Sequence, residues 1–442
     1  MSTASPRHNR PERLTSDDDL FVRMEHALGL PVVNQVFWRL PGQFDRSRFE
    51  AIASRLKQGR LSRLIVRTPF PLRDRWIHTA DAGRHDYADE PIAAGDCLNW
   101  ALTQLTSEIN SLSGPSWRLS AAPSADTDET FVSWVGSHSI GDGGAIITGI
   151  EEACADTHFD TTNISPSVTD TLSEGASSLR ASADAAWHLI RGKSASGGAV
   201  APQSPPVNRT VRWSGTNPSL VVSVPADEFD AAAARIGGTA NSLFTAIVLG
   251  ILESTGRVHE GQEIPVSLPM STRTPDDRRA NATTGVTASV LVDSGRYQDL
   301  TPIRVASKAA YRQPESGPGA LALLGTLAQP MGDGIVRKLA ADSRAPLCLA
   351  SNLGVLTDSF AGLGGDPGRV AMRSMTSGAS LDTMRRMAGG ISGWLSRSAG
   401  AITLCVTALD PDRVPDTETL SGLMSDELGK WGLPTTFWAA SS

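Results

Sequence analysis

Cysteine is scarce in this sequence, with four residues in a chain of 442. The four, Cys97, Cys154, Cys348 and Cys405, are widely spaced and form no Cys-x-x-Cys pair. This spacing predicts neither a disulfide framework nor a cysteine zinc site. Three of them lie in apolar runs, which favours reduced thiols in a protein core and a cytoplasmic location.

Long apolar runs are also missing. No segment approaches the ~20 apolar residues that a membrane-spanning helix needs, and the longest, 243–252, is suited to a core helix. The first twenty residues are rich in Ser, Arg and Asp and have no apolar centre. We therefore predict a disordered leader over 1–20 and no signal peptide. A net charge of −7 indicates no basic surface for nucleic acid or anionic lipid.

The length of the chain predicts more than one hydrophobic core. A chain of 442 residues with 40% hydrophobic content is large enough for two domains, each of about 200 residues. A Pro-, Ser- and Gly-rich stretch at 193–207 has the composition of a linker. We expect an N-terminal lobe over 21–192 and a C-terminal lobe over 208–442.

Strand and helix patterns are mixed along both halves, which predicts an α/β fold. In the first half, strands are expected at 32–40, 64–67, 117–121 and 130–135, and helices at 45–56, 98–109, 144–155 and 179–190, with a polar connection at 156–178. In the second half, strands are expected at 220–224, 264–268, 286–292, 347–350 and 401–407, and helices at 226–236, 242–252 and 417–429.

His138 is followed four residues later by Asp142 and Gly143, between the strand at 131–135 and the helix at 144–155. A loop held between a strand and a helix places its side chains rigidly at a surface crevice, where a catalytic base must lie. A neutral imidazole is well matched to proton abstraction at physiological pH. The alternative is a loop histidine bonded to a carbonyl, with Asp142 capping the following helix.

Other catalytic classes have less support. His8 lies in the predicted leader, and His78, His85 and His158 have polar surroundings that predict solvent exposure. His26, His188 and His259 have no carboxylate or cysteine at ligand spacing, so no metal site is predicted. The chain has no Gly-x-Ser-x-Gly elbow, which argues against a serine hydrolase. The glycine-rich run at 362–368 lacks the Lys-Ser/Thr ending of a phosphate-binding loop and is interpreted as a turn.

Several segments, in order along the chain, resemble one superfamily. The motif His-His-x-x-x-Asp-Gly matches His138, Asp142 and Gly143, with Ser137 in place of the first histidine. Three later segments also match: 265–273 followed by Asn281, the strand end at 350–354, and 404–415. Together they resemble the condensation-type, CoA-dependent acyltransferases. The greatest similarity is to wax ester synthase/diacylglycerol acyltransferases and polyketide-associated acyltransferases. The similarity is weak before residue ~30 and through 156–210.

The resemblance implies two chloramphenicol acetyltransferase-like lobes with a channel between them. It implies that His138 is the general base, that Asp142 pins the loop against an arginine, and that Gly143 lets the backbone turn. The arginine is left open among Arg60, Arg63, Arg73, Arg75 and Arg273. Ser137 is expected to shape the loop beside the substrate. The candidate donors to the oxyanion are Asn281, Ser351 and Asn352.

The implied reaction moves an acyl group from acyl-CoA, or from a phosphopantetheine thioester on an acyl carrier protein, to a hydroxyl of a lipid or natural product. No other cofactor is implied. Peripheral membrane contact is left open, although no basic amphipathic stretch supports it. Two alternatives stand beside this function. One is a condensation enzyme with an amine acceptor, and the other is a non-catalytic relative that recruits a carrier protein.

Overall fold

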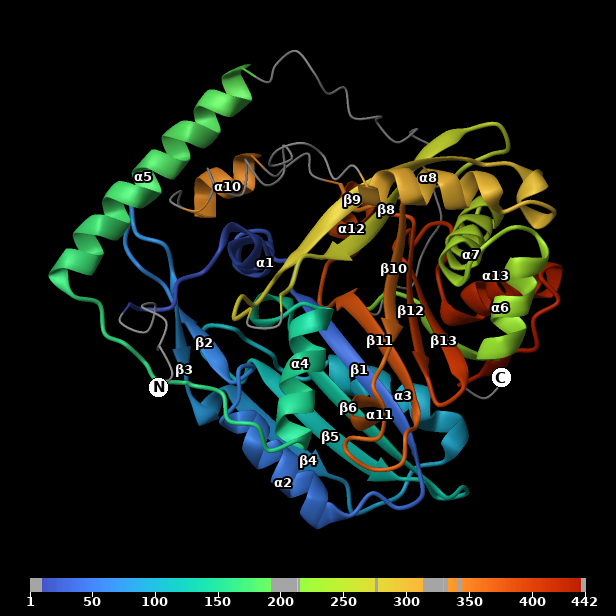
Figure 1. The fold of residues 1–442 in the computed structure, drawn as a ribbon, viewed down its shortest axis with the longest axis horizontal. Coiled ribbons are helices and arrows are strands. Elements are labelled where there is room, and N and C mark those ends of the chain that lie inside the picture. The colour runs from blue at the N-terminus through green and yellow to red at the C-terminus, as the bar shows by residue number, and fades with distance from the viewer. Residues whose placement is uncertain are drawn as a thin grey trace, which may run out of the picture.

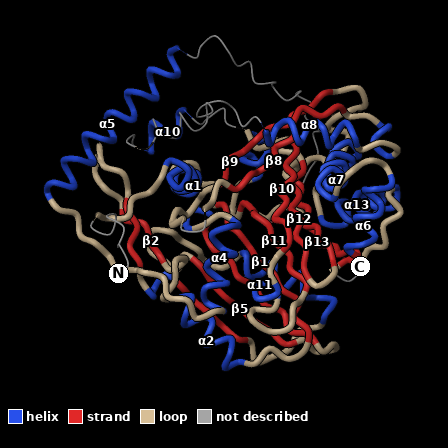
Figure 2. The backbone as a smooth tube through the Cα atoms, in the orientation of Figure 1, coloured by secondary structure: helices blue, strands red, loops and turns tan. Residues whose placement is uncertain are grey.

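The described residues fold around two large β-sheets with helices on their outer faces, and a two-stranded sheet, β2-β3, accompanies the first (Figure 1). The structure is a computed structural model and describes residues 10–191, 213, 215–274, 277–312, 329, 333–339 and 344–438. Figure 2 shows strands from both halves of the chain side by side in the middle of the molecule. The predicted mixed α/β class is confirmed. The linker predicted at 193–207 and the start of the predicted leader lie outside the described residues.

The first sheet has the strand order β11-β1-β6-β5-β4. Its central strands β1 (Val32–Pro41) and β6 (Glu129–Ser137) are antiparallel, with Val33 opposite Ser137. β6 is buried over most of its length because both faces of the sheet are covered. The histidine motif therefore leaves the end of a central strand, where the backbone is held on both sides.

Strand β11 (Arg369–Thr376) belongs to the second half of the sequence but completes the first sheet. It runs antiparallel to β1, with Thr376 opposite Val32 and Arg369 opposite Arg39. An uncovered edge of β1 would expose unpaired backbone groups, and β11 supplies their partners. The predicted boundary between lobes at 193–207 therefore does not divide the sheets, because the chain returns to the first sheet after building most of the second.

The second sheet has the strand order β14-β7-β13-β12-β10-β8-β9. Helix α7 (Ala240–Ser254) packs on it, and every residue from Ser242 to Leu252 is buried, which suits the apolar run seen in the sequence. Within the described ranges, no single helix is long and apolar enough to cross a bilayer. The hairpin of β8 (Glu263–Ser271) and β9 (Thr283–Leu291) extends toward the first lobe, as Figure 1 shows in yellow.

The other elements mostly follow the predicted pattern and add several short strands and helices. The first lobe also contains α2 (Arg46–Lys57), β2 (Arg63–Val66), β3 (Arg75–His78), β4 (Gly83–Tyr87), α3 (Cys97–Leu105), β5 (Trp117–Pro123), α4 (Gly143–Cys154) and α5 (Val168–Arg191). The second half contains β7 (Ser219–Pro225), α6 (Ala226–Arg235), α8 (Thr301–Arg312), α10 (Asp333–Leu339), β10 (Cys348–Val355), α11 (Asp358–Ala361), α12 (Leu381–Met387), β12 (Ile391–Ser398), β13 (Ala401–Ala408), α13 (Thr417–Lys430) and β14 (Thr436–Phe437).

Two helices differ from the prediction. Residues 16–20, assigned to a disordered leader, form the first turns of α1 (Ser16–His26). Thr15 and Asp18 form a capping box at the start of this helix, and the acidic residues of its first turn interact favourably with the helix dipole. Helix α5 begins at Val168, inside the predicted polar connection, because its Asp170 and Glu174 form ion pairs with arginines of the first lobe.

Candidate active site

The motif forms a tight loop between β6 and α4. His138–Ile140 is a single 3₁₀ turn, and Asp142 is the N-cap of α4. Two carbonyls of the loop accept hydrogen bonds from side chains of β2 and β1. Arg63 Nη2 donates to the Ile140 carbonyl at 2.8 Å, and Asn34 Nδ2 donates to the Gly141 carbonyl at 2.8 Å. The loop is therefore fixed by its own backbone partners before any substrate is considered.

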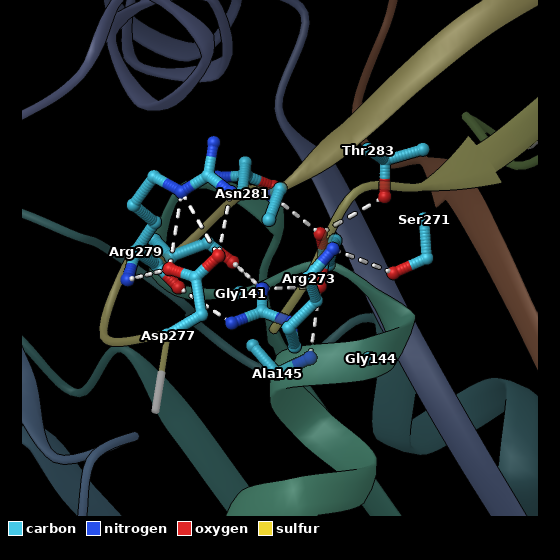
Figure 3. Close-up of polar contacts among 12 residues, drawn as sticks. Gly141, Gly144, Ala145, Ser271, Arg273, Asp277, Arg279, Asn281 and Thr283 are labelled. Carbon is cyan, nitrogen blue, oxygen red and sulfur yellow. Dashed lines mark hydrogen bonds and ion pairs between the residues drawn. The ribbon is translucent and has the colours of Figure 1, made fainter. Parts of the chain in front are cut away.

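The Asp142 carboxylate accepts four hydrogen bonds, three of them from the β8–β9 hairpin of the second half. Oδ1 accepts from Ala145 N at 2.8 Å and from Arg273 Nη2 at 2.9 Å. Oδ2 accepts from Ala282 N at 2.7 Å and from the Thr283 hydroxyl at 2.9 Å. Figure 3 shows Arg273 and Thr283 converging on the loop beside Ala145. Asp142 is thus both a helix cap and the partner of an arginine.

Among the arginines left open by the sequence, the structure selects Arg273 as the partner of Asp142. Burial alone would raise the pKa of Asp142, but Arg273 and the surrounding N–H donors hold that pKa below its ordinary value of 3.8. Asp142 is therefore ionised and clamps the hairpin onto the loop. The other candidates bind elsewhere: Arg60 to Glu152, Arg63 to Glu12 and the loop backbone, and Arg73 to Glu174, while Arg75 lies on β3 opposite Val66.

The imidazole of His138 is held through Nδ1, which lies 3.1 Å from Asn281 Oδ1. Asn281 Nδ2 lies 3.1 Å from Asp18 Oδ1 and 3.3 Å from the Ser139 carbonyl oxygen, and both oxygens act as acceptors. The amide nitrogen must face these two acceptors, which leaves the amide oxygen facing the ring. Nδ1 therefore carries the proton and donates it to Asn281. The lone pair of His138 is on Nε2.

Phe21 of α1 covers one face of the imidazole. The two ring centroids lie 3.7 Å apart with an interplanar angle of 15°. Burial lowers the pKa of His138 below its ordinary value of 6.5, although the nearby Asp142 carboxylate opposes that shift. The residue as a whole keeps partial solvent exposure. The site therefore contains a neutral imidazole at neutral pH, with one nitrogen available to accept a proton.

Removal of the Phe21 ring should raise the pKa of His138. With Phe21→Ala, water reaches the imidazole and the cost of charging it falls, so its pKa should move up toward 6.5. An NMR titration of the ring protons measures this pKa directly. Phe21→Leu keeps an apolar cover and should retain the depressed pKa. An unchanged pKa in Phe21→Ala would show that Phe21 does not control the burial of the ring.

Ser137, which stands where the related motif has its first histidine, is 2% exposed. Its hydroxyl lies 2.6 Å from the Ser139 hydroxyl and donates to Glu25 Oε2 at 3.0 Å. Gly143 begins α4, and a Cβ there would lie 3.0 Å from Leu353 Cδ2 at the end of β10. Ser137 therefore lies between the loop and α1. Gly143 lies where the two halves of the chain meet.

The three candidate oxyanion donors have different surroundings. Both polar atoms of the Asn281 amide are engaged: the oxygen accepts from the imidazole, and the nitrogen donates to Asp18 and to the Ser139 carbonyl. Asn281 is therefore suited to position the base. Asn352 Nδ2 donates to Asn241 Oδ1 of α7 at 3.2 Å. Ser351 is 9% exposed and precedes Leu353 by two residues on β10. Its role as a donor stays a prediction.

Sequence reasoning missed the contribution of α1. Asp18, Phe21 and Glu25 all contact the histidine loop or its immediate partner Asn281. Two signals were present: the capping pair Thr15-x-x-Asp18, and the spacing of 18, 21 and 25 along one helix face. The low hydrophobicity of the segment concealed both, because a short polar helix resembles a leader.

Other features nearby are modest. A pocket of about 360 Å³ lies between the first turns of α4 and the hairpin loop, lined by Arg60, Gly144, Ile147, Thr148, Arg273, Thr274 and Asp277. Arg273 therefore lies at the edge of an open space while Asp142 holds its guanidinium. In the part of the chain that the structure describes, no group of three or more histidine, cysteine or carboxylate side chains could hold a metal ion.

Known structures match the chain in fold at low sequence identity. No protein-family model and no curated protein sequence matches the chain. The wax ester synthase/diacylglycerol acyltransferase from Marinobacter aquaeolei VT8 matches with a TM-score of 0.57 and 12% identity, covering 95% of this chain and 98% of that one. The first condensation domain of the CDA synthetase matches with a TM-score of 0.58 and 12% identity, covering 98% of both chains.

A third structure is a mutant starter condensation domain of rhizomide synthetase in complex with C8-CoA and Leu-SNAC. It matches with a TM-score of 0.53 and 13% identity, covering 96% of this chain and 94% of that one. These matches span nearly the whole chain. The chain therefore has the fold of the condensation-type acyltransferases, with two chloramphenicol acetyltransferase-like lobes.

Proposed function

We propose that this protein is an acyltransferase. It moves an acyl group from acyl-CoA, or from a carrier-protein thioester, to a hydroxyl of a lipid or natural product. One observation carries the proposal: Nδ1 of His138 lies 3.1 Å from Asn281 Oδ1, and its Nε2 has no hydrogen-bonding partner among the residues that the structure describes. A side chain in this state is prepared to take a proton and has no evident structural use for its second nitrogen.

The proposed reaction is a direct transfer. His138 Nε2 takes the proton of the acceptor hydroxyl while the acceptor oxygen attacks the thioester carbonyl. The tetrahedral intermediate then collapses, the carbon–sulfur bond breaks, and the imidazolium returns the proton to the departing thiolate. Asn281 Oδ1 accepts the Nδ1–H throughout, so the ring does not need to rotate between the two proton transfers.

The tetrahedral oxyanion needs a donor near the base. Of the three candidates, Ser351 is the one whose side chain has no hydrogen-bonding partner among the described residues, and we keep it as the proposed donor. Support for a hydroxyl acceptor comes from the segments that resemble wax ester synthases. Arg273 and Asn281 belong to these segments, and they bind Asp142 and His138 respectively.

Release of free thiol from acyl-CoA tests the proposal. Purified protein is incubated with mixed acyl-CoAs, with and without long-chain alcohols, and products are identified by mass spectrometry. The proposal expects thiol release that depends on the alcohol and an ester product. An amide formed with an added amine, and no ester, would instead indicate a condensation enzyme. Binding of a carrier protein with no turnover on any acceptor would indicate a recruiting module.

The transfer rate should depend on pH through His138. Because burial places the pKa of His138 below 6.5, the base stays unprotonated across neutral pH. The value of kcat/KM should therefore be flat from about pH 7 upward and fall as the pH drops through that lower pKa. A rate profile from pH 4.5 to 8.5 measures the midpoint. A midpoint above 6.5 would contradict the neutral, buried imidazole.

A further inference from the structure

One face of α1 packs against the histidine loop. Asp18, Phe21 and Glu25 follow one another at intervals of three and four residues, which puts them on the same side of a helix. Asp18 binds the amide that holds the base, Phe21 stacks on His138, and Glu25 binds a hydroxyl of the loop. In Figure 1, α1 lies above α4 and to the left of the β8–β9 hairpin.

Asp18 is 1% exposed and uses both carboxylate oxygens as acceptors. Oδ1 accepts from the backbone N–H of Asn281 at 2.8 Å and from its side-chain amide at 3.1 Å. Oδ2 accepts from the backbone N–H of Thr15 at 3.0 Å. A carboxylate oxygen only accepts hydrogen bonds, so the amide of Asn281 must turn its nitrogen, and not its oxygen, toward Asp18.

We propose that Asp18 is a positioning residue: by binding the Asn281 amide, it fixes the amide oxygen toward His138 and so keeps the ring proton on Nδ1. A rotated amide would present its nitrogen to Nδ1. The ring proton would then move to Nε2, where it blocks acceptance of the hydroxyl proton. The inference rests on the proposed function, because the tautomer affects the rate only if His138 is the base.

Charged groups approach this chain of contacts from several elements. Burial raises the pKa of Asp18 above its ordinary 3.8, and Arg63 opposes that shift. With a proton on Oδ2, Asp18 would still accept both N–H groups of Asn281 at Oδ1, and the amide would keep its orientation. The charged neighbours are Asp17 on α1, Arg63 on β2, Asp142 at the start of α4, and Arg273 and Arg279 of the hairpin loop.

The variant Asp18→Asn tests the proposal in the full chain. An amide at position 18 has one oxygen and one nitrogen, so its nitrogen must face an N–H group of either Asn281 or Thr15. The orientation of the Asn281 amide is then no longer fixed. We expect kcat to fall about 10- to 100-fold with little change in KM, which is the usual cost of losing a group that orients a functional side chain. Nitrogen-15 NMR of His138 should show a shift from the Nδ1–H to the Nε2–H tautomer.

Two further variants separate positioning from stability. Asp17→Asn changes the neighbouring carboxylate on α1 and should leave both the tautomer and kcat as in the wild type. In the background Asn281→Ala, position 281 carries no amide for Asp18 to orient. There, addition of Asp18→Asn should cause no further loss of kcat. An equal loss in both backgrounds would mean that Asp18 acts only on stability, and would overturn the proposal.

The tautomer also separates this inference from the proposed function. In one outcome, the wild type transfers no acyl group, but His138 carries its proton on Nδ1 and Asp18→Asn moves that proton to Nε2. The positioning role then stands and the proposed reaction is wrong. If the wild type is active with the proton on Nε2, the positioning role is overturned and the reaction remains.

Discussion

Replacement of His138 by alanine should lower the transfer rate about 10²- to 10⁴-fold, the range that general-base catalysis contributes. The physical reason is that neither of the two neighbouring side chains, Asp142 and Asn281, can accept the proton in its place. The neighbouring carboxylate of Asp142 is occupied by four donors, and Asn281 has no basic group. The measurement is kcat for alcohol-dependent thiol release, with a thermal melt to verify the fold.

Two variants accompany His138→Ala. His138→Asn keeps a hydrogen-bonding side chain in the loop but no group basic enough to act, so it should be as inactive as alanine while remaining closer to the wild type in stability. His158→Ala removes an exposed histidine and should leave kcat unchanged. A His138→Ala variant that retains more than about a tenth of the wild-type rate would exclude His138 as the general base.

Replacement of Asp142 by alanine should be the most destabilising change in the site. It would leave the Arg273 guanidinium buried without its carboxylate and three further donors without an acceptor. Removal of one member of a buried ion pair typically costs 3–5 kcal/mol, so we expect a loss of about that size in the free energy of unfolding. Chemical denaturation followed by tryptophan fluorescence measures it.

A second helix cap supplies the matched control. Asp416 caps α13 by accepting from Thr419 N at 2.8 Å, and it is exposed to solvent. Asp416→Ala should therefore cost only about 1 kcal/mol, the usual value of a cap. Because the folded pKa of Asp142 lies below 3.8, its contribution is present above that pH and is lost as the pH falls through the folded pKa. Equal costs for the two variants at pH 7 would mean that the Arg273 clamp adds nothing.

The central strands and helices of each lobe could be predicted because their patterns are local. The strands expected at 32–40 and 130–135 lie within β1 and β6, and the helices expected at 45–56 and 242–252 match α2 and α7 within a few residues. Alternating or continuous apolar residues determine these elements wherever the rest of the chain lies. Short strands such as β3 and β4 were missed because four or five residues carry too little pattern.

The motif loop was also readable, since His138, Asp142 and Gly143 lie close together in the sequence. The sequence also named Arg273 and Asn281 as candidates, but not which side chain each one binds, because both come from a hairpin more than a hundred residues away. Asp18, from a helix at the other end of the chain, was not named. Nothing local distinguishes Arg273 from Arg60 or Arg63 as the partner of Asp142. The distinction depends on which guanidinium the hairpin brings to within 2.9 Å of the carboxylate.

The sequence by itself determined a two-lobed α/β protein and the presence of a histidine on a loop between a strand and a helix. Only the tertiary structure decided which nitrogen of His138 is free, because the tautomer depends on an amide from one distant segment and a carboxylate from another. The same holds for the sheet that β11 completes. Contacts across hundreds of residues depend on the packing of whole elements, and local residue preferences do not specify that packing.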